Sequence, residues 1–558
     1  MRVLGVNAVF HDPAAALVVD GCTIAAAEEE RFSRRKHGKA PVAFSSWELP
    51  EQAMAFCLEA GGLRPEDLDA VAYSYDPALV GAAEDHPTAD PWEWLRTLFA
   101  ARAPLFLRTA LPGLEPERVR FVGHHAAHAA SAHAASPFPS CAVMVLDGRG
   151  ERHSALLGMA REGRLEVLAR QELPHSLGLL YEELTAHLGF RRSSDEYKVM
   201  AMASYGRPTY LEALRELVVA DARGGYRVDP ALDLERFAPR LEDGAHWRPE
   251  HADLAASVQA RLEEIMLELA AWLHEHTGER RLAMAGGVAL NCVANTRLLR
   301  EGPFSQIWVQ PAAGDAGTAL GAAQAVAREL GDRVAPVPSA ALGPSWDEDE
   351  LAAWLDRAGV AYERPADVAD AVAAALADDA IVAWFQGRSE FGPRALGHRS
   401  LLADPRRAEN LERINDVKGR EQFRPVAPMV LASRAADLFS GGPLPSPHML
   451  FVHEVASAWA ERIPAVVHVD GTARIQTVDT ADEPLVARML EGFAARTGVP
   501  AVVNTSLNTA GRPMVDDPRD ALECFGSAPV DMLAIGPFVV RRGEGLGAVA
   551  ERREAVAA

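Results

Sequence analysis

Three short apolar segments, separated by a polar loop and then by a tight turn, occur twice in the first third of the chain. The copies span residues 3–28 and 143–168. Their apolar segments are residues 3–7, 14–19, 23–28, 143–146, 153–159 and 165–168. Short apolar runs joined by pairs such as Asp20-Gly21 and Glu162-Gly163 are typical of strands in β-hairpins. The sequence therefore predicts an α/β protein whose first domain contains a duplicated strand unit.

Size and charge narrow the class of protein further. A chain of 558 residues exceeds what one hydrophobic core usually contains, so we expect two large domains or three smaller ones. The formal net charge of −22 argues against nonspecific binding to nucleic acid or to an anionic membrane. The chain begins with an apolar strand pattern and has no apolar stretch of transmembrane length. We expect a cytoplasmic protein that binds neither nucleic acid nor membranes, and the sequence leaves its oligomeric state open.

The composition changes after the first 330 residues. Prolines without helical periodicity predict a linker, and the following part has a helical pattern at 366–378 and a strand pattern at 380–384. The expected division is a first domain at 1–335, a linker at 336–349, a second domain at 350–545 and a tail at 546–558.

Two histidines stand four positions apart in an alanine-rich run. On the helix that this run predicts, His124 and His128 project from one face. Asp147 follows the apolar run 141–146 and precedes Gly148, which places a carboxylate at the end of a predicted strand. Imidazole and carboxylate groups bind several divalent metals. This segment alone supports a metal site and a set of buried or solvated helix histidines about equally.

Two glycine turns extend the pattern. Gly286 and Gly287 separate a predicted strand from a predicted helix, and Gly314 and Asp315 lead into an alanine-rich helix. Glycine lets backbone N–H groups approach phosphate oxygens closely, although glycines in turns are commonly structural. With the duplicated strands, the order of these segments resembles the two-lobed actin-like ATPase fold (ASKHA, RNase H-like), whose loops bind nucleotide phosphates.

Four polar loops follow in the second half of the chain, and the first three of them contain arginine. They lie at residues 392–400, 418–425, 472–477 and 504–508. Arginine suits bidentate binding of phosphate or carboxylate, and Lys418 adds a point charge. Any one arginine could be structural. Asn504 and Asn508 could supply amide contacts to a small planar substrate, or they could equally form turns. Several such loops in one domain of an acidic protein favour an anion pocket.

These motifs together resemble the O-carbamoyltransferases of the NodU/CmcH/TobZ family over nearly the whole chain. The matching segments are residues 28–34, 124–128, 286–291, 392–400, 423–425 and 504–508. The resemblance implies an actin-like domain similar to the tRNA threonylcarbamoyltransferase TsaD. It also implies that an α+β domain with a YrdC-like core follows.

The same resemblance implies a two-step reaction. Carbamoyl phosphate and ATP, with Mg, would form carbamoyl adenylate in the second domain, and the first domain would transfer the carbamoyl group to a hydroxyl. Iron(II) or another divalent metal is implied there, with the ligands His124, His128, Asp147 and Asp315. The implied catalytic residues are His11, as general base, and Arg394, Lys418, Arg424 and Arg474. The implied substrate and nucleotide contacts are Lys198, Gly148, Gly286, Gly287, Asn291, Arg399, Asn504, Thr505, Ser506 and Asn508.

Several alternatives remain at this stage. Transfer of a threonylcarbamoyl group to tRNA is disfavoured because tRNA binding needs a basic surface. A nucleotide-binding regulator without enzymatic activity and a sugar kinase are weaker alternatives, since neither explains the histidine pair. The expected acceptor is a hydroxylated small-molecule natural product such as a glycoside or macrolide antibiotic. Residues 80–115 and 230–255 are expected to shape its pocket, and the basic loop 34–37 is expected near the nucleotide or the acceptor.

Overall fold

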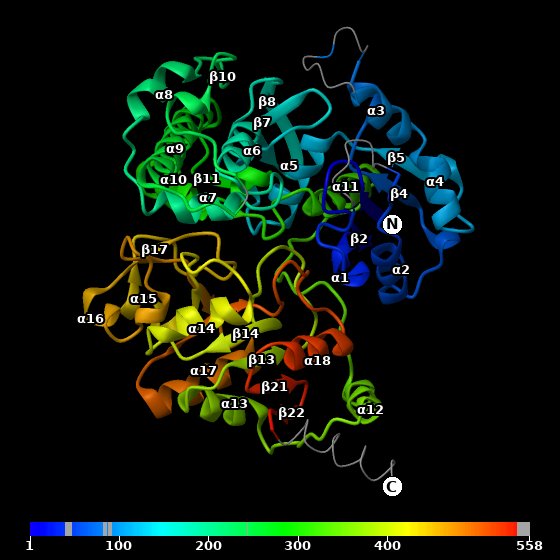
Figure 1. Cartoon of the computed structure of the whole chain (residues 1–558). Helices are drawn as coiled ribbons and strands as arrows, with labels where there is room; N and C mark the ends of the chain where they lie inside the picture. Colours follow the sequence, from blue (N-terminus) through cyan, green and yellow to red (C-terminus); the bar gives the residue numbers. More distant parts are fainter. Residues whose placement is uncertain (40–46, 82–85, 87–91, 243, 544–558) are drawn as a thin grey trace. The chain divides into compact units, whose positions relative to one another are not determined.

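The computed structural model describes residues 1–39, 47–81, 86, 92–242 and 244–543. The chain divides into two compact units, Met1–Ala340 and Ala341–Ala558 (Figure 1). The predicted tail at 546–558 lies outside the described residues. None of the helices in the described part combines the length and the apolar character that a membrane span requires.

The first unit contains two five-stranded sheets with the same strand order. One has the order β3-β2-β1-β4-β5, and the other the order β8-β7-β6-β11-β12. In each sheet the first three strands along the chain pair antiparallel and the last two join in parallel. The strands are β1 (Arg2–Asn7), β2 (Ala14–Val19), β3 (Cys22–Glu28), β4 (Ala70–Tyr73), β5 (Val119–Phe121), β6 (Ser140–Leu146), β7 (His153–Arg161), β8 (Arg164–Glu172), β11 (Arg281–Ala285) and β12 (Gln306–Val309). The predicted duplication is confirmed.

The two hairpin turns explain why the repeat was visible in the sequence. Asp20 and Gly21 both have positive φ angles, 49° and 79°, and Glu162 and Gly163 have 51° and 77°. Positive φ at both central residues is the condition of a type I′ turn, whose twist matches that of the flanking strands. The same local geometry therefore recurs in both copies.

Helices α5 (His124–Ala135) and α11 (Ala316–Glu329) pack against each other between the two sheets. Helix α5 contacts β6, β7 and β11, whereas α11 contacts β1, β2 and β4. A Cβ atom at Gly321 would lie 1.8 Å from the Ala127 carbonyl oxygen, so only glycine permits this approach. The close packing fixes the starts of both helices, where histidine and aspartate side chains lie.

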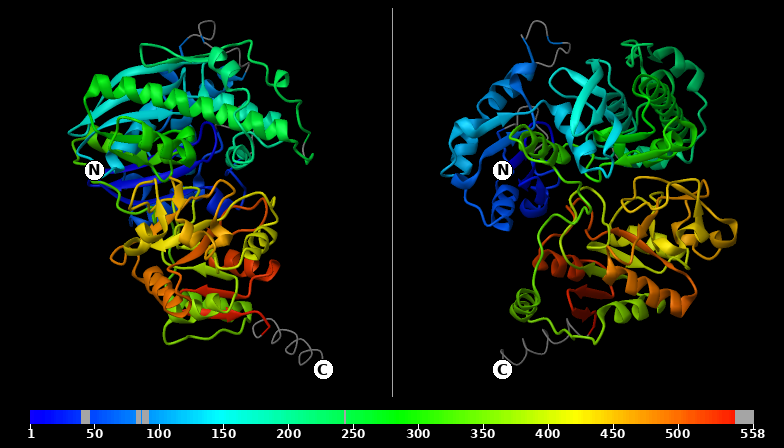
Figure 2. Two further views of the ribbon diagram at one scale, coloured as in Figure 1. Left: turned by 90° about the vertical axis from the view of Figure 1, so that its left-hand side faces the viewer. Right: turned by 180° about the vertical axis from the view of Figure 1, so that it is seen from behind.

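Further helices and a small hairpin complete the first unit. The 29-residue helix α9 is seen lengthwise in the left view of Figure 2. These elements are α1 (Glu30–Ser33), α2 (Glu51–Ala60), α3 (Glu93–Ala101), α4 (Ala103–Ala110), α6 (Leu177–His187), α7 (Glu196–Ala203), α8 (Leu211–Leu217), α9 (Pro249–Thr277), α10 (Cys292–Glu301), β9 (Val218–Ala220) and β10 (Tyr226–Val228).

The second unit is also mixed α/β. Its seven-stranded sheet has the order β19-β15-β20-β14-β13-β21-β22 and combines parallel with antiparallel pairs; a smaller sheet has the order β16-β17-β18. The strands are β13 (Val382–Phe385), β14 (Arg399–Ala403), β15 (Ala427–Leu431), β16 (Phe439–Ser440), β17 (His453–Val455), β18 (Thr472–Ala473), β19 (Gln476–Val478), β20 (Ala501–Ser506), β21 (Met532–Ile535) and β22 (Phe538–Arg541). The helices are α12 (Glu348–Ala358), α13 (Val368–Ala377), α14 (Glu409–Val417), α15 (Ala432–Leu438), α16 (Ser457–Ala460), α17 (Pro484–Thr497) and α18 (Pro518–Ser527).

The predicted helix and strand of this unit correspond to α13 and β13. Two details differ from the sequence expectation. Residues 348–349 of the predicted linker are helical, because Asp347 caps α12 through a hydrogen bond from the Glu350 N–H. In the first unit, a 3-10 turn at Gly287–Leu290 comes between the double glycine and α10.

Candidate metal and anion sites

Four buried side chains of the first unit converge. His124 and His128 come from the first turns of α5, Asp147 follows β6, and Asp315 precedes α11. The His124 Nε2 atom lies 3.2 Å from Asp147 Oδ2 and 3.7 Å from Asp315 Oδ1. The His128 Nε2 atom lies 3.6 Å and 3.7 Å from the same two oxygens. One ligand atom from each residue lies within 4.8 Å of all the others.

These spacings fit a divalent cation. A metal with bonds of about 2.1 Å holds neighbouring ligand atoms about 3.0–3.4 Å apart. The separations of 3.2–3.7 Å would need only a small contraction. His128 Nε2 and Asp315 Oδ2 are buried and have no hydrogen-bond partner in the described part of the chain, which is costly for polar atoms. Two imidazoles and two carboxylates form a donor set that iron(II), manganese and zinc all accept.

Backbone groups hold the first carboxylate in place. The Gly287 N–H donates a 2.9 Å hydrogen bond to Asp147 Oδ1. Gly286 has a φ of 91°, and a Cβ atom there would lie 2.2 Å from the Leu146 carbonyl oxygen. The double glycine thus lets its loop approach Asp147 closely enough to donate. These two glycines and Gly148, predicted to contact nucleotide, border the four-residue cluster.

The pKa shifts of the cluster fit a cation-binding site. Burial lowers the pKa of His128, but Asp147 and Asp315 outweigh burial and raise this pKa to about 9. For Asp147 and Asp315, burial raises the pKa, but the neighbouring histidines outweigh burial and bring both pKa values below the ordinary value of an aspartate. A divalent cation would satisfy the same carboxylates in place of a proton.

His11, the predicted base, lies beside this cluster. Its Nε2 atom is 3.8 Å from Asp315 Oδ2, and its Nδ1 atom is 2.9 Å from Asp12 Oδ2. Burial lowers the pKa of His11, but Asp315 and Asp12 raise it well above the ordinary value. His11 also follows Phe10, whose ring packs edge-on against His124 at 5.2 Å. The predicted base and the predicted metal ligands therefore share one polar centre.

Two further predicted contacts have protein partners in the structure. The Asn291 side-chain oxygen accepts a hydrogen bond from the Ala294 N–H and so caps α10, while its amide donates to Gln259. Lys198 lies 3.1 Å from Asp195 and over the Phe190 ring.

Lys39, which the sequence did not single out, contacts the loop that carries His11. It is buried, and its ammonium donates to the Ala8 carbonyl (2.6 Å) and the Val9 carbonyl (3.0 Å). Burial lowers its pKa to about 7. The available signal was its rarity, since lysine occurs at only four positions among 56 Lys and Arg residues.

In the second unit, three predicted residues meet at the end of β20. The Lys418 ammonium donates to Ser506 Oγ at 3.0 Å and to the side-chain oxygen of Asn508. Thr505 stands one residue earlier on β20, in register with Leu401 of β14. These contacts place the Lys418 ammonium beside the loop that follows β20.

Asn504 connects two arginine loops. Its amide donates to the Ala395 carbonyl at 3.1 Å and to Gln476 Oε1 at 2.7 Å. Its own Oδ1 is buried and has no hydrogen-bond partner among the residues that the structure describes. Arg394 and Arg474 flank the two residues that Asn504 contacts, and both arginines are half-buried. Arg424 lies on a third loop and pairs with Glu421 at 3.3 Å.

Arg474 has a hydrogen-bond donor that the described residues leave unused. Its Nε atom is buried and has no hydrogen-bond partner among the described residues. Burial and Arg474 itself lower the pKa of the neighbouring His468, to about 4. A buried N–H group of a guanidinium is costly unless it meets an acceptor, and a bound anion would supply one. The loops of this unit thus form a candidate anion site.

Arg399, predicted to contact a ligand, is fully buried and engages the protein. Its guanidinium donates to the carbonyl oxygens of Gln386 (2.8 Å), Gly387 (3.1 Å) and Pro344 (3.2 Å), and it stacks on Phe385 at 3.8 Å. These contacts support a structural role.

Replacing Arg399 with leucine should therefore destabilise the protein. The change leaves several buried carbonyl groups unpaired, so we expect the free energy of unfolding to fall by about 3 kcal/mol. Chemical denaturation followed by tryptophan fluorescence measures this change. An unchanged unfolding midpoint, together with lost activity, would instead make Arg399 a ligand contact.

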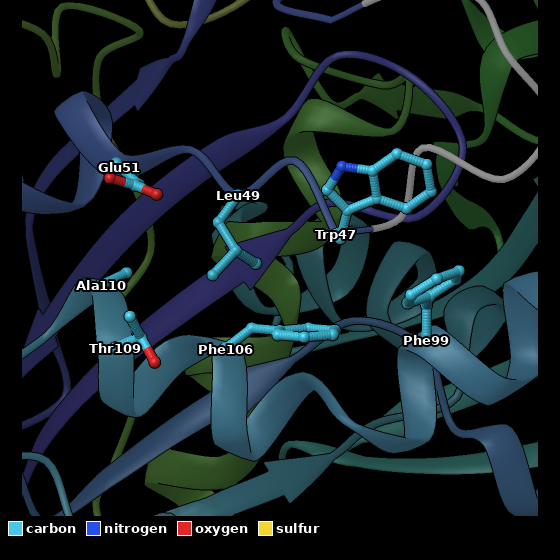
Figure 3. Close-up of a pocket in the computed structure, with 7 residues that line it drawn as sticks. All are labelled: Trp47, Leu49, Glu51, Phe99, Phe106, Thr109 and Ala110. Atoms are coloured by element: carbon cyan, nitrogen blue, oxygen red, sulfur yellow. The ribbon is translucent and has the colours of Figure 1, made fainter.

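Part of the predicted acceptor stretch lines a pocket. Its volume is about 500 Å³, and Figure 3 shows Phe99 of α3 and Phe106 of α4 across from Trp47 and Leu49 of the segment before α2. The lining residues are Trp47, Leu49, Glu51, Phe99, Phe106, Thr109 and Ala110. Other residues of the stretch, at 82–85 and 87–91, and residue 243 of the second stretch lie outside the described residues. The pocket is apolar with one carboxylate and one hydroxyl.

Comparisons with known proteins give the family. The model of the carbamoyltransferase N-terminus matches residues 2–83 and 107–324, and that of the carbamoyltransferase C-terminus matches residues 373–542. Nodulation protein NolNO of Sinorhizobium fredii is 39% identical, with 96% of this chain and 80% of that protein covered. Nodulation protein U of Bradyrhizobium diazoefficiens is 30% identical, with 94% and 95% covered.

Solved structures are more distant. HypF of T. kodakarensis aligns over 59% of this chain and 47% of its own, with 18% identity and a TM-score of 0.38. The matches to the family models cover both units and the loops that carry the two polar sites. The chain therefore belongs to the carbamoyltransferase family and is a carbamoyltransferase.

Proposed function

We propose that this carbamoyltransferase uses carbamoyl phosphate and ATP to carbamoylate a hydroxyl group of a small-molecule natural product. The observation that carries the proposal is the presence of two chemically different polar sites, one in each unit. Arg474 and Lys418 mark the candidate anion site, whereas His124, Asp147 and their partners form a cluster suited to a metal. Two sites of these kinds suit a reaction with an activation step and a transfer step.

In the activation step, the second unit would bind the reactants through their phosphates. Arg394, Lys418, Arg424 and Arg474 would bind carbamoyl phosphate and the ATP phosphates and stabilise the charge of the reacting groups. Water attacks the carbonyl carbon of carbamoyl phosphate, and inorganic phosphate leaves, which gives carbamate. The carbamate oxygen then attacks the α-phosphate of ATP, giving carbamoyl adenylate and pyrophosphate. We propose for this unit the YrdC-like core that the resemblance implies.

In the transfer step, the first unit would act as an actin-like nucleotide-binding domain. A divalent metal such as iron(II), held by His124, His128, Asp147 and Asp315, would supply positive charge at the adenylate. His11 would accept the proton of the acceptor hydroxyl at Nε2 as the new C–O bond forms and the bond to AMP breaks. The short distance between His11 and Asp315 supports this common site.

The specificity of the enzyme for its acceptor would come from parts of the chain that the family models do not match. Residues 84–106, which include α3, lie outside the segments that the family models match. Phe99 of α3 lines the aromatic pocket, and Arg96 of the same helix stacks on Phe10 at 5.3 Å, next to His11. The apolar lining favours an apolar or aromatic part of the acceptor over a polycationic one.

The test is pyrophosphate release from ATP, measured with and without carbamoyl phosphate. We expect release that depends on carbamoyl phosphate and is reduced about 100-fold in Arg424→Ala. The exposed Arg434, which pairs with Asp437, provides the control variant Arg434→Ala, whose rate should equal that of the wild type. Metal-loaded wild-type protein that releases no pyrophosphate, even with candidate acceptors present, would contradict the proposed route.

A further inference from the structure

A chain of hydrogen bonds leads away from His11 on the side opposite to Asp315. Asp12 contacts two histidines at once: its Oδ2 atom is 2.9 Å from His11 Nδ1, and its Oδ1 atom is 2.9 Å from His37 Nδ1. The other nitrogen of His37, Nε2, is 2.8 Å from Ser194 Oγ. Three distant segments, namely the β1–β2 loop, the loop after α1 and the α6–α7 loop, meet in this network.

The chemistry of the groups gives each bond a direction. Burial raises the pKa of Asp12, but His11 and His37 bring it well below its ordinary value, so the carboxylate is ionised and can only accept. Both histidines must therefore donate from Nδ1. In neutral His37, Nε2 then accepts from the Ser194 hydroxyl, and in neutral His11, Nε2 keeps its lone pair.

Three residues in the loops of this network have an unfavourable backbone conformation. Asp12, His37 and Ser193 are non-glycine residues with φ angles of 47°, 63° and 53°. This left-handed region is unfavourable for such side chains and persists where the surrounding structure determines it, often at functional sites.

A second cation does not explain the arrangement. Asp12, His37 and Glu30 are close enough to hold a metal. However, Glu30 accepts from the Lys36 ammonium at 3.1 Å and from the His37 N–H at 2.8 Å, so its charge is already balanced. These two bonds instead anchor the loop that carries His37.

We infer that His37 is a positioning residue for the transfer step: through Asp12 it holds the ring of His11 with Nε2 free to receive the acceptor's proton. The inference rests on the proposed role of His11 as base. A carboxylate that is itself held by a second hydrogen bond orients a histidine more tightly than a carboxylate without that bond. Hydrogen-bonded carboxylates orient metal-bound and catalytic histidines in this way. Ser194 connects the same network to the α6–α7 loop.

Two substitutions separate the contacts of His37. In His37→Asn the amide nitrogen occupies roughly the place of Nδ1 and can still donate to Asp12, while the Ser194 contact is lost. In His37→Gln the amide reaches toward Ser194 and the Asp12 bond is lost. We expect His37→Gln to lower kcat for acceptor carbamoylation about 10–100-fold, with the acceptor KM within about threefold of the wild type. His37→Asn should keep kcat within about threefold.

Single-turnover release of pyrophosphate in the second unit should be the same in both variants, and circular dichroism with thermal unfolding verifies their fold. Equal kcat values in the wild type and His37→Gln would overturn the inference. A larger loss in His37→Asn than in His37→Gln would also overturn it, because the Ser194 contact would then be the important one. If wild-type protein transfers no carbamoyl group at all, the proposed function fails instead, whatever the variants do.

Discussion

The variant Asp147→Asn is expected to lose the bound divalent metal and with it the transfer of the carbamoyl group to an acceptor. Asparagine has the same shape, and its oxygen can still accept from the Gly287 N–H, so the loop should keep its conformation. The substitution removes the negative charge that faces His124 and His128. We expect metal affinity to fall at least about 100-fold, since even residues beyond the ligands contribute 10–100-fold.

Elemental analysis after dialysis against a weak chelator measures the metal, and mass spectrometry of the acceptor measures transfer. Carbamoyl-phosphate-dependent pyrophosphate release in the first turnover should persist, because it belongs to the second unit. Glu29→Gln is the matched control: Glu29 is equally buried, and its carboxylate accepts from the Ala53 N–H at 2.9 Å, away from the cluster. Wild-type metal content in Asp147→Asn would remove Asp147 from the ligand set.

The variant Arg474→Gln is expected to show the reverse pattern. The substitution removes a positive charge. The Nε atom of this guanidinium has no protein partner in the described ranges, so the free energy of unfolding should change little. If Arg474 binds a phosphate in the activation step, the kcat/KM for pyrophosphate release should fall about 100–1000-fold, the usual effect of losing one electrostatic donor.

Metal content in Arg474→Gln should equal that of the wild type, because the metal cluster lies in the other unit. The exposed Arg434 provides the matched control, as Arg434→Gln removes the same charge from α15. Normal pyrophosphate release by Arg474→Gln would show that the unpaired guanidinium serves another purpose. Together with Asp147→Asn, the variant would assign one half-reaction to each unit.

The sequence predicted local structure well where local chemistry decides it. The strands of both hairpins were recognisable because turns such as Asp20-Gly21 have one favourable backbone geometry. The 3-10 turn after Gly286 was not predicted; its first residue, Gly287, donates a tertiary hydrogen bond to Asp147, a contact that short sequence patterns do not contain.

Site residues divide in the same way. The spacing of His124 and His128 determined that both would lie on one helix face. The contacts of Arg399 could not be read from its motif, because its carbonyl partners come from separate segments. His37 had appeared only as part of a basic loop, and its bond to Ser194, 157 residues away, depends on the fold.

The sequence by itself determined the duplicated strand unit, the family and the residue types of both polar sites, since these depend on short spacings and motifs. Only the tertiary structure decided which side chains meet, because contacts across hundreds of residues arise from sheet order and helix packing. Asp315 thus joins His124 through the close approach of α5 and α11, which Gly321 permits. Helix α11 also packs on β1 and β2, and the loop between these strands carries His11, whose Nε2 atom lies 3.8 Å from Asp315 Oδ2.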